Sequence, residues 1–144
     1  MVSSLPTLIK LEKHRVEQVQ KQLNDTRAGI ADMDAQLEAL EAEVLRGGEV
    51  AAELNDPAVF GQAAAYIKVA RIKAEKLKAN RATLVEAEAK QLVTLNTHFA
   101  AQKRYETLHQ RHEAAAKRVR EGKIQQGLDE VAGVSWQSGE ATGT

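Results

Sequence analysis

Two histidines, His109 and His112, lie three residues apart in the stretch "HQRH", a spacing that places both side chains on the same side of a helix. A histidine pair of this kind can bind zinc when further ligands stand nearby. No carboxylate or third histidine has an evident ligand position, because His98 is about three helical turns away. We interpret these histidines as polar surface side chains and expect no metal and no cofactor.

Other catalytic patterns are also missing from the sequence. It has no Gly-rich phosphate loop, no Ser-His-Asp set and no cysteine that could supply a thiolate. The helices predicted below form a rod, and a rod of two helices offers no pocket that excludes water. We therefore expect that the protein is not an enzyme.

The composition is typical of long helices. Ala, Glu, Lys, Leu and Arg make up about half of the 144 residues, and only 3% are aromatic. Large side chains are too few to fill a globular core, whereas two paired helices need only a narrow aliphatic seam. No apolar run approaches the roughly 20 residues of a membrane span, and the N-terminal stretch does not look like a signal peptide. We expect a cytoplasmic protein.

The first helix is predicted over residues 6–46, beginning at Pro6. Its apolar residues recur every seven positions, which predicts a coiled-coil seam on one helix face. One register holds Ile9, Val16, Leu23, Ile30, Leu37 and Val44, and the companion register holds Leu5, Glu12, Val19, Thr26, Met33 and Leu40.

The stretch "RGGEVAAELNDP" predicts a reversal of the chain over residues 47–56. Gly47 and Gly48 favour the end of the first helix, since glycine readily adopts the left-handed conformation found there. Asp56 is a suitable N-cap, and Pro57 suits the first position of a second helix. The two helices would then be antiparallel neighbours.

The second helix is predicted over residues 57–121, with a weaker seam. Its first part fits one heptad register, and a slip of phase then appears, typical of a stutter. The first register holds Phe60, Ala63, Ile67, Ala70, Ala74, Leu77 and Leu84, and the shifted one holds Leu92, Leu95, Phe99, Leu108 and Val119. If Val44 faces Phe60, Ile9 pairs with Leu95. About 20 residues of the second helix then project beyond the start of the first.

The charges support this arrangement. Residues 31–56 hold one basic and eight acidic groups, whereas residues 57–85 hold six basic and one acidic group. Folding at the break places these segments side by side, and their attraction favours one orientation. We thus expect one domain, an antiparallel coiled-coil hairpin over residues 1–123, followed by a mostly disordered tail over residues 124–144. The sequence leaves open whether Trp136 in this tail is a docking residue.

Three stretches together resemble the FliJ-like family of flagellar type III export stalks, which is related to the YscO-type stalks of injectisomes. Residues 5–40, ending in "QLEAL", look like the family's first helix. The stretch "AAAYIKVARIKAEKL" resembles the start of its second helix, and the run that closes with "LDEVA" resembles its charged C-terminal part. The resemblance covers roughly residues 5–132, and it rests on the order of these stretches more than on any one motif.

This resemblance implies a role in flagellum biogenesis, flagellar protein export and, through them, chemotaxis. Family members bind the centre of the export ATPase hexamer, promote its assembly and activity, contact the cytoplasmic part of the export gate and handle export chaperones. A member would be monomeric and located in the cytoplasm, peripherally associated with the inner face of the cell membrane.

Two sets of candidate contact residues follow from the resemblance. The ATPase would bind the basic end of the rod through Lys10, Lys13, Arg15, Arg111, Lys117, Arg118 and Arg120. The export gate would bind nearer the bend, through Gln36, Leu40 and Tyr66. Some relatives carry aromatic residues shortly after the position of Leu40, where this chain has Glu43 and Gly47.

Other interpretations stay open. The stalk could serve an injectisome instead of a flagellum. A helical hairpin that binds nucleic acid would need a basic face along much of its length, and the net charge of −5 over residues 1–56 argues against it. A prefoldin-like holdase would need β-hairpins that the break does not encode. An architectural coiled coil would dimerise through an exposed seam.

Overall fold

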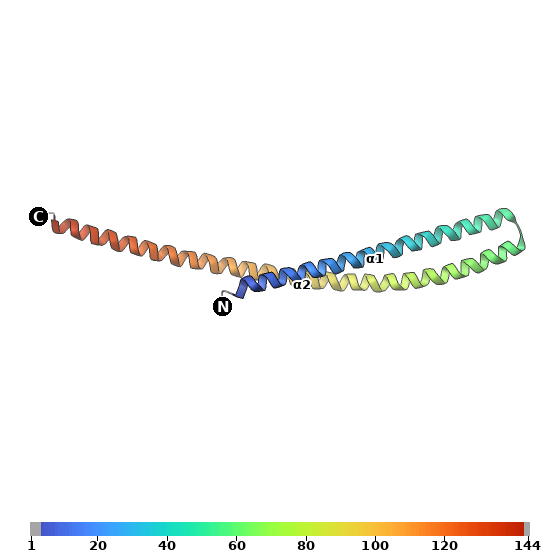
Figure 1. The fold of residues 1–144 in the computed structure, drawn as a ribbon, viewed down its shortest axis with the longest axis horizontal. Coiled ribbons are helices and arrows are strands. Elements are labelled where there is room, and N and C mark those ends of the chain that lie inside the picture. The colour runs from blue at the N-terminus through green and yellow to red at the C-terminus, as the bar shows by residue number, and fades with distance from the viewer. Residues whose placement is uncertain (1–3, 143–144) are drawn as a thin grey trace. The chain divides into compact units, whose positions relative to one another are not determined.

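The computed structural model describes residues 4–142, and the side chains among them through residue 136. It contains two helices and no strand over these residues: α1 spans Leu5–Leu54 and α2 spans Pro57–Thr142. Figure 1 shows both helices and the short connector between them. The predicted all-α fold with two long helices packed against each other is confirmed.

Contacts divide the chain into two compact units. One is His14–His98, and the other joins the residues through Lys13 to α2 from Phe99 onward. Within the first unit, Arg27 lies 3.6 Å from Glu88, and Asp34 lies 2.6 Å from Arg81. Early residues of α1 therefore meet late residues of this part of α2, which confirms the antiparallel pairing.

The seam of α1 follows the predicted heptads. Every position of both registers is buried or half-buried, and Val16, Leu23 and Val19 are at most 7% exposed. The two registers continue beyond the predicted end of the helix, to Gly47 and Ala51. The aliphatic pattern of α1 is therefore sufficient to define which of its faces is covered.

The connector differs from the prediction. α1 does not end at Gly47 and Gly48 but continues through Leu54, and no glycine among the described residues has a positive φ. Asn55 takes the left-handed conformation instead, with φ of 47°, and its N–H donates to the carbonyl of Ala51. Asparagine tolerates this conformation better than most residues. Asn55 therefore ends the helix, and Gly47 and Gly48, which were predicted to end it, lie inside the helix.

The start of α2 is as predicted. The Asp56 carboxylate accepts a hydrogen bond from the Ala58 N–H at 3.0 Å, and its carbonyl accepts one from the Phe60 N–H. Asp56 is therefore the N-cap, and Pro57 is the first helical residue.

The longer α1 changes the register of the hairpin. Val44 does not face Phe60 but lines a common groove with Ala70 and Ala74, further along α2. Phe60 is 46% exposed, and Val59 is the residue that is half-buried there. Because the turn lies at Asn55 and Asp56, later in the chain than the centre of the predicted break, each residue of α1 meets a later residue of α2 than predicted.

The predicted stutter in α2 is wrong. The buried and half-buried residues of α2 that face α1 keep one seven-residue spacing as far as His112. Several of these positions hold polar side chains, whereas the prediction considered only apolar ones. One register holds Ala63, Ala70, Leu77, Leu84, Gln91, His98, Tyr105 and His112, and the other holds Ile67, Ala74, Arg81, Glu88, Leu95, Gln102 and His109. Phe99 and Leu108, which had suggested the slip, are 45% and 41% exposed.

α2 also continues past the predicted end near Glu121, to Thr142. Each described side chain from Glu113 to Trp136 is exposed, so this stretch packs against no other described part of the chain. A helix without packing is marginal in water. The expected disorder of residues 124–144 stays a prediction, and its last two residues lie outside the described range.

Candidate partner-binding sites

The predicted basic contact residues are exposed on both helices. Lys10 and Lys13 fall in the same compact unit as the four predicted residues of α2, whereas Arg15 falls in the unit His14–His98. The structure therefore groups six of the seven residues in one unit, namely Lys10, Lys13, Arg111, Lys117, Arg118 and Arg120.

The Glu106 carboxylate neutralises part of this positive charge. Its carboxylate accepts a hydrogen bond from the Gln102 amide at 2.9 Å and lies 3.7 Å from the Lys103 ammonium. The Gln102 hydrogen bond is the main reason that the pKa of Glu106 is lowered, and the charges of Lys103 and Lys13 lower it further. Lys13 and Lys103 thus have a carboxylate close by, and a partner would have to compete with it.

Three arginines of α2 have no such neighbour. Arg104, Arg111 and Arg118 are exposed and make no ion pair with any described residue. They are spaced by seven residues, so they lie along one line on the helix, with a rise of about 10 Å between neighbours. We call these three residues the arginine line.

The remaining predicted residues of α2 are placed differently. Lys117 forms an ion pair with Glu121 at 3.9 Å. Arg120 follows Arg118 by two residues, which turns its side chain about 160° away around the helix axis. Arg118 and Arg120 therefore cannot both face one flat partner, although the sequence analysis treated them as equivalent.

A shallow groove adjoins the arginine line. It has a volume of about 520 Å³ and is lined by Lys103, Arg104, Thr107, Leu108 and Arg111. The Lys103 ammonium also lies 5.7 Å from the centre of the Phe99 ring, a cation–π distance. Sequence reasoning missed Lys103 and Arg104, although the seven-residue spacing of the arginines was visible in the sequence.

The histidines of the "HQRH" stretch are half-buried, not surface residues as predicted. His109 and His112 occupy heptad positions of α2, as does His98. His109 lies 3.8 Å from Glu113, and its Nδ1 has no hydrogen-bond partner among the described residues. Over residues 4–142, no group of three or more His, Cys, Asp or Glu side chains is arranged to hold a metal ion.

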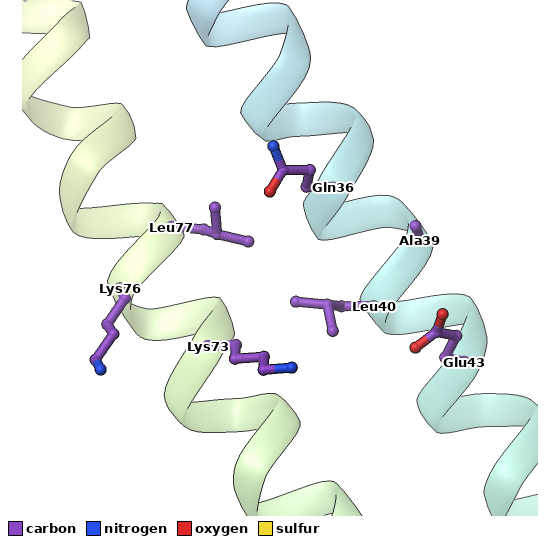
Figure 2. A pocket seen from close by; sticks show the side chains of 7 residues that line it. All are labelled: Gln36, Ala39, Leu40, Glu43, Lys73, Lys76 and Leu77. Atoms are coloured by element: carbon purple, nitrogen blue, oxygen red, sulfur yellow. The ribbon is translucent and has the colours of Figure 1, made fainter.

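The predicted gate residues lie in the unit His14–His98. Gln36 and Leu40 line an interhelical groove of about 460 Å³ together with Glu43, Lys73 and Leu77. Figure 2 shows Leu40 and Leu77 pointing toward each other from the two helices, with Lys73 extending toward α1. Gln36 also donates a hydrogen bond to Asp32 at 2.8 Å. This groove combines an apolar floor with charged edges.

Tyr66 lines a neighbouring groove that also includes Glu43. Its hydroxyl donates a hydrogen bond to the Glu43 carboxylate, and this bond is the main reason that the pKa of Tyr66 is raised above its usual value. Arg46 acts in the opposite direction by favouring the phenolate. Tyr66 is 44% exposed, so part of this residue stays accessible beside Glu43.

No helix in the described part of the chain is both long enough and apolar enough to cross a membrane. Comparisons of the chain with protein-family models, with curated proteins and with solved structures give no match.

Proposed function

We propose that this chain is a non-enzymatic stalk of a flagellar type III protein export apparatus. The stalk binds the centre of a ring-shaped export ATPase, promotes its assembly and activity, and links it to the export gate and to export chaperones. The observation that best supports this proposal is an antiparallel helix hairpin in which α2 continues unpacked beyond His112, with Lys117, Arg118, Arg120 and Lys123 in the first part of that continuation.

A hairpin of this kind suits a central stalk for mechanical and electrostatic reasons. Two paired helices have a cross-section of roughly 20 Å, and an interhelical seam holds them together. Charged residues at one end steer that end toward an oppositely charged channel and set its orientation there. The hairpin contributes no chemistry, and the ATPase hydrolyses the nucleotide.

The arginine line is the part of the basic end that we assign to the ATPase contact. Arginine stays charged at every physiological pH, and its planar guanidinium binds carboxylates with two parallel hydrogen bonds. Arg104, Arg111 and Arg118 make no ion pair with other described residues, so docking requires no intramolecular pair to break. A ring that presents carboxylates about 10 Å apart along its channel would match them.

The proposal is tested by mixing the chain with the export ATPase of its host. We expect the chain to raise ATPase activity and to promote hexamer formation. Arg118→Glu should reduce the apparent affinity at least tenfold, because it places an acidic group in the arginine line. Arg120→Glu changes the net charge equally from another face of α2 and is the matched control. No stimulation by the unchanged chain would refute the proposal, and equal losses in both variants would refute the arginine line.

The contact with the export gate is assigned to the groove that contains Gln36 and Leu40 and to the neighbouring Tyr66. Tyr66→Ala should weaken binding to the cytoplasmic domain of the gate without affecting ATPase stimulation, because Tyr66 is 44% exposed and the two sites belong to different units. The alternatives are an injectisome stalk of the same family and an unrelated helical hairpin that is structural or binds nucleic acid. Binding of RNA that weakens steeply with salt, without any effect on the ATPase, would favour a nucleic-acid-binding hairpin.

A further inference from the structure

The shallow groove beside the arginine line has the arrangement of a hole in a coiled coil. Four of its lining residues, Arg104, Thr107, Leu108 and Arg111, stand at positions i, i+3, i+4 and i+7 of α2. In a coiled coil, an apolar side chain of one helix inserts among four such neighbours on the facing helix. Leu108 is 41% exposed, so the groove offers accessible apolar surface between two arginines.

The same arrangement recurs seven residues further along α2. Arg111, Ala114, Ala115 and Arg118 form a second set with the spacing i, i+3, i+4 and i+7, and all four are exposed. Alanine side chains extend only one carbon from the backbone, so this set leaves room for a large side chain of a partner. Two successive holes with a seven-residue period suit another helix, because a partner helix can repeat its apolar side chains at that period.

The charges on this side of α2 indicate what such a helix carries. The arginine line borders both holes and makes no ion pair with any described residue. The acidic residues of the same stretch have other neighbours: Glu106 lies 3.7 Å from Lys103, Glu113 lies 3.8 Å from His109 and Glu121 lies 3.9 Å from Lys117. Glu106 and Glu113 each follow an arginine of the line by two residues, which turns them about 160° away around the helix axis. Three guanidiniums are therefore available to the carboxylates of a partner.

We infer that the arginine line and the two holes bind an acidic α-helix, with apolar side chains at every seventh position and carboxylates beside them. The apolar side chains enter the holes at Leu108 and at the two alanines, and the carboxylates form paired hydrogen bonds with the guanidiniums. A helix that inserts into lipid needs a broad apolar face, whereas this side of α2 carries an arginine at every seventh position. The inference rests on the proposed function only for the identity of the partner, the export ATPase, and adds which kind of element makes the contact.

Three synthetic 21-residue helical peptides test the inference on the full chain. The first has leucines at every seventh position flanked by glutamates, and the second has glutamines in place of the glutamates. The third has the composition of the first, with its leucines moved off the seven-residue spacing. Fluorescence anisotropy at low salt should show the first peptide binding about tenfold more tightly than either of the others, because charged hydrogen bonds and occupied holes both contribute.

Two pairs of variants separate the holes from the charge. Ala115→Phe fills the second hole and should weaken binding of the first peptide about tenfold, whereas Ala116→Phe places the same ring about 100° around the helix and should leave binding unchanged. Arg111→Gln removes the guanidinium that both holes share and should weaken binding about tenfold. Its control is Arg120→Gln, which removes an equal charge from another side of α2. Circular dichroism should show intact helices in all four variants, because each substituted side chain is exposed.

Equal binding of the first and third peptides would overturn the inference, because charge alone would then explain the attraction. So would unchanged binding by Ala115→Phe, or tighter binding of polyuridine RNA than of the first peptide. Self-association in sedimentation that Arg111→Gln abolishes would assign the line to a second copy and overturn it too. The peptides need no ATPase, so absent peptide binding with intact ATPase stimulation refutes only this inference. Peptide binding without stimulation refutes only the proposed function.

Discussion

The two compact units use the same heptad spacing but fill it with different side chains. Within His14–His98, the buried positions of α1 are Val16, Val19, Leu23, Thr26 and Ala51, of which only Thr26 is polar. In the other unit, the buried Leu5 is accompanied by the buried polar residues Glu12 and Gln102. Buried polar groups stabilise less than aliphatic ones and demand partners. The comparison teaches that aliphatic burial dominates in one unit of this chain, whereas buried polar groups carry much of the seam in the other.

The difference also explains where interactions with other proteins are expected. A seam of aliphatic residues is covered by the partner helix and leaves the outer faces of both helices exposed. In the second unit, covered positions end at His112, and the arginine line continues past this point to Arg118. That unit therefore offers an unpacked helix, whereas the first offers a rigid one.

The largest expected effect comes from truncating the aliphatic seam. Leu23 is 4% exposed, and Leu23→Ala should lower the free energy of unfolding by about 2 to 3 kcal/mol, because it removes buried methyl groups and leaves a cavity. Leu128 is 59% exposed, and Leu128→Ala should change the free energy of unfolding by less than about 0.5 kcal/mol. Urea unfolding followed by circular dichroism measures both. Similar losses in the two variants would contradict the contrast between paired and unpacked helix.

A smaller effect should distinguish two glycines of α1. Gly29→Leu should destabilise the fold by about 1 to 3 kcal/mol, since even a Cβ there approaches Leu84 to 3.1 Å. Gly48→Leu meets no atom within 4 Å at its Cβ and should stabilise the fold by up to about 1 kcal/mol, because leucine favours a helix more than glycine does. Thermal unfolding of both variants measures the sign. Stabilisation by Gly29→Leu would show that the helices are not closely packed there.

The smallest expected effect concerns pH in the polar unit. The pKa of Glu106 is lowered from 4.5, so its contribution to stability is present above that value and is lost as the pH falls through the lowered pKa. Gln102→Leu removes the hydrogen bond that is the main cause, so the pKa of Glu106 should rise. NMR titration of the Glu106 side chain measures this change, with Glu86→Gln as a control at a separate carboxylate. An unchanged pKa in Gln102→Leu would mean that the lysines, not the amide, determine it.

Much of the fold was predictable because it depends on local chemistry. The seven-residue recurrence of aliphatic side chains in α1 defines the covered face, and the Asp56-Pro57 pair defines where α2 begins. The polar half of the α2 seam was not predictable in this way. Gln102, His109 and His112 occupy heptad positions, yet a search for apolar residues passes over them and finds a phase slip that does not exist.

The candidate sites, like the fold, were predictable only in part. The sequence indicated a basic end and named Arg111 and Arg118, because clustered charge is visible in composition. It also named Arg120, which only the helix geometry separates from Arg118. Arg104 was missed, although its seven-residue spacing from Arg111 lay within a helix that was predicted to be continuous there.

By itself, then, the sequence determined two helices, their antiparallel order and the covered face of α1, since periodicity and capping act over a few residues. The tertiary structure decided the register, because placing Val44 beside Ala70 depends on where along the chain the turn lies and on the fit of both helices. It also decided which glycine serves packing: Gly29 lies against Leu84 and Gly61 lies in open space, a difference made by a neighbour distant in the chain.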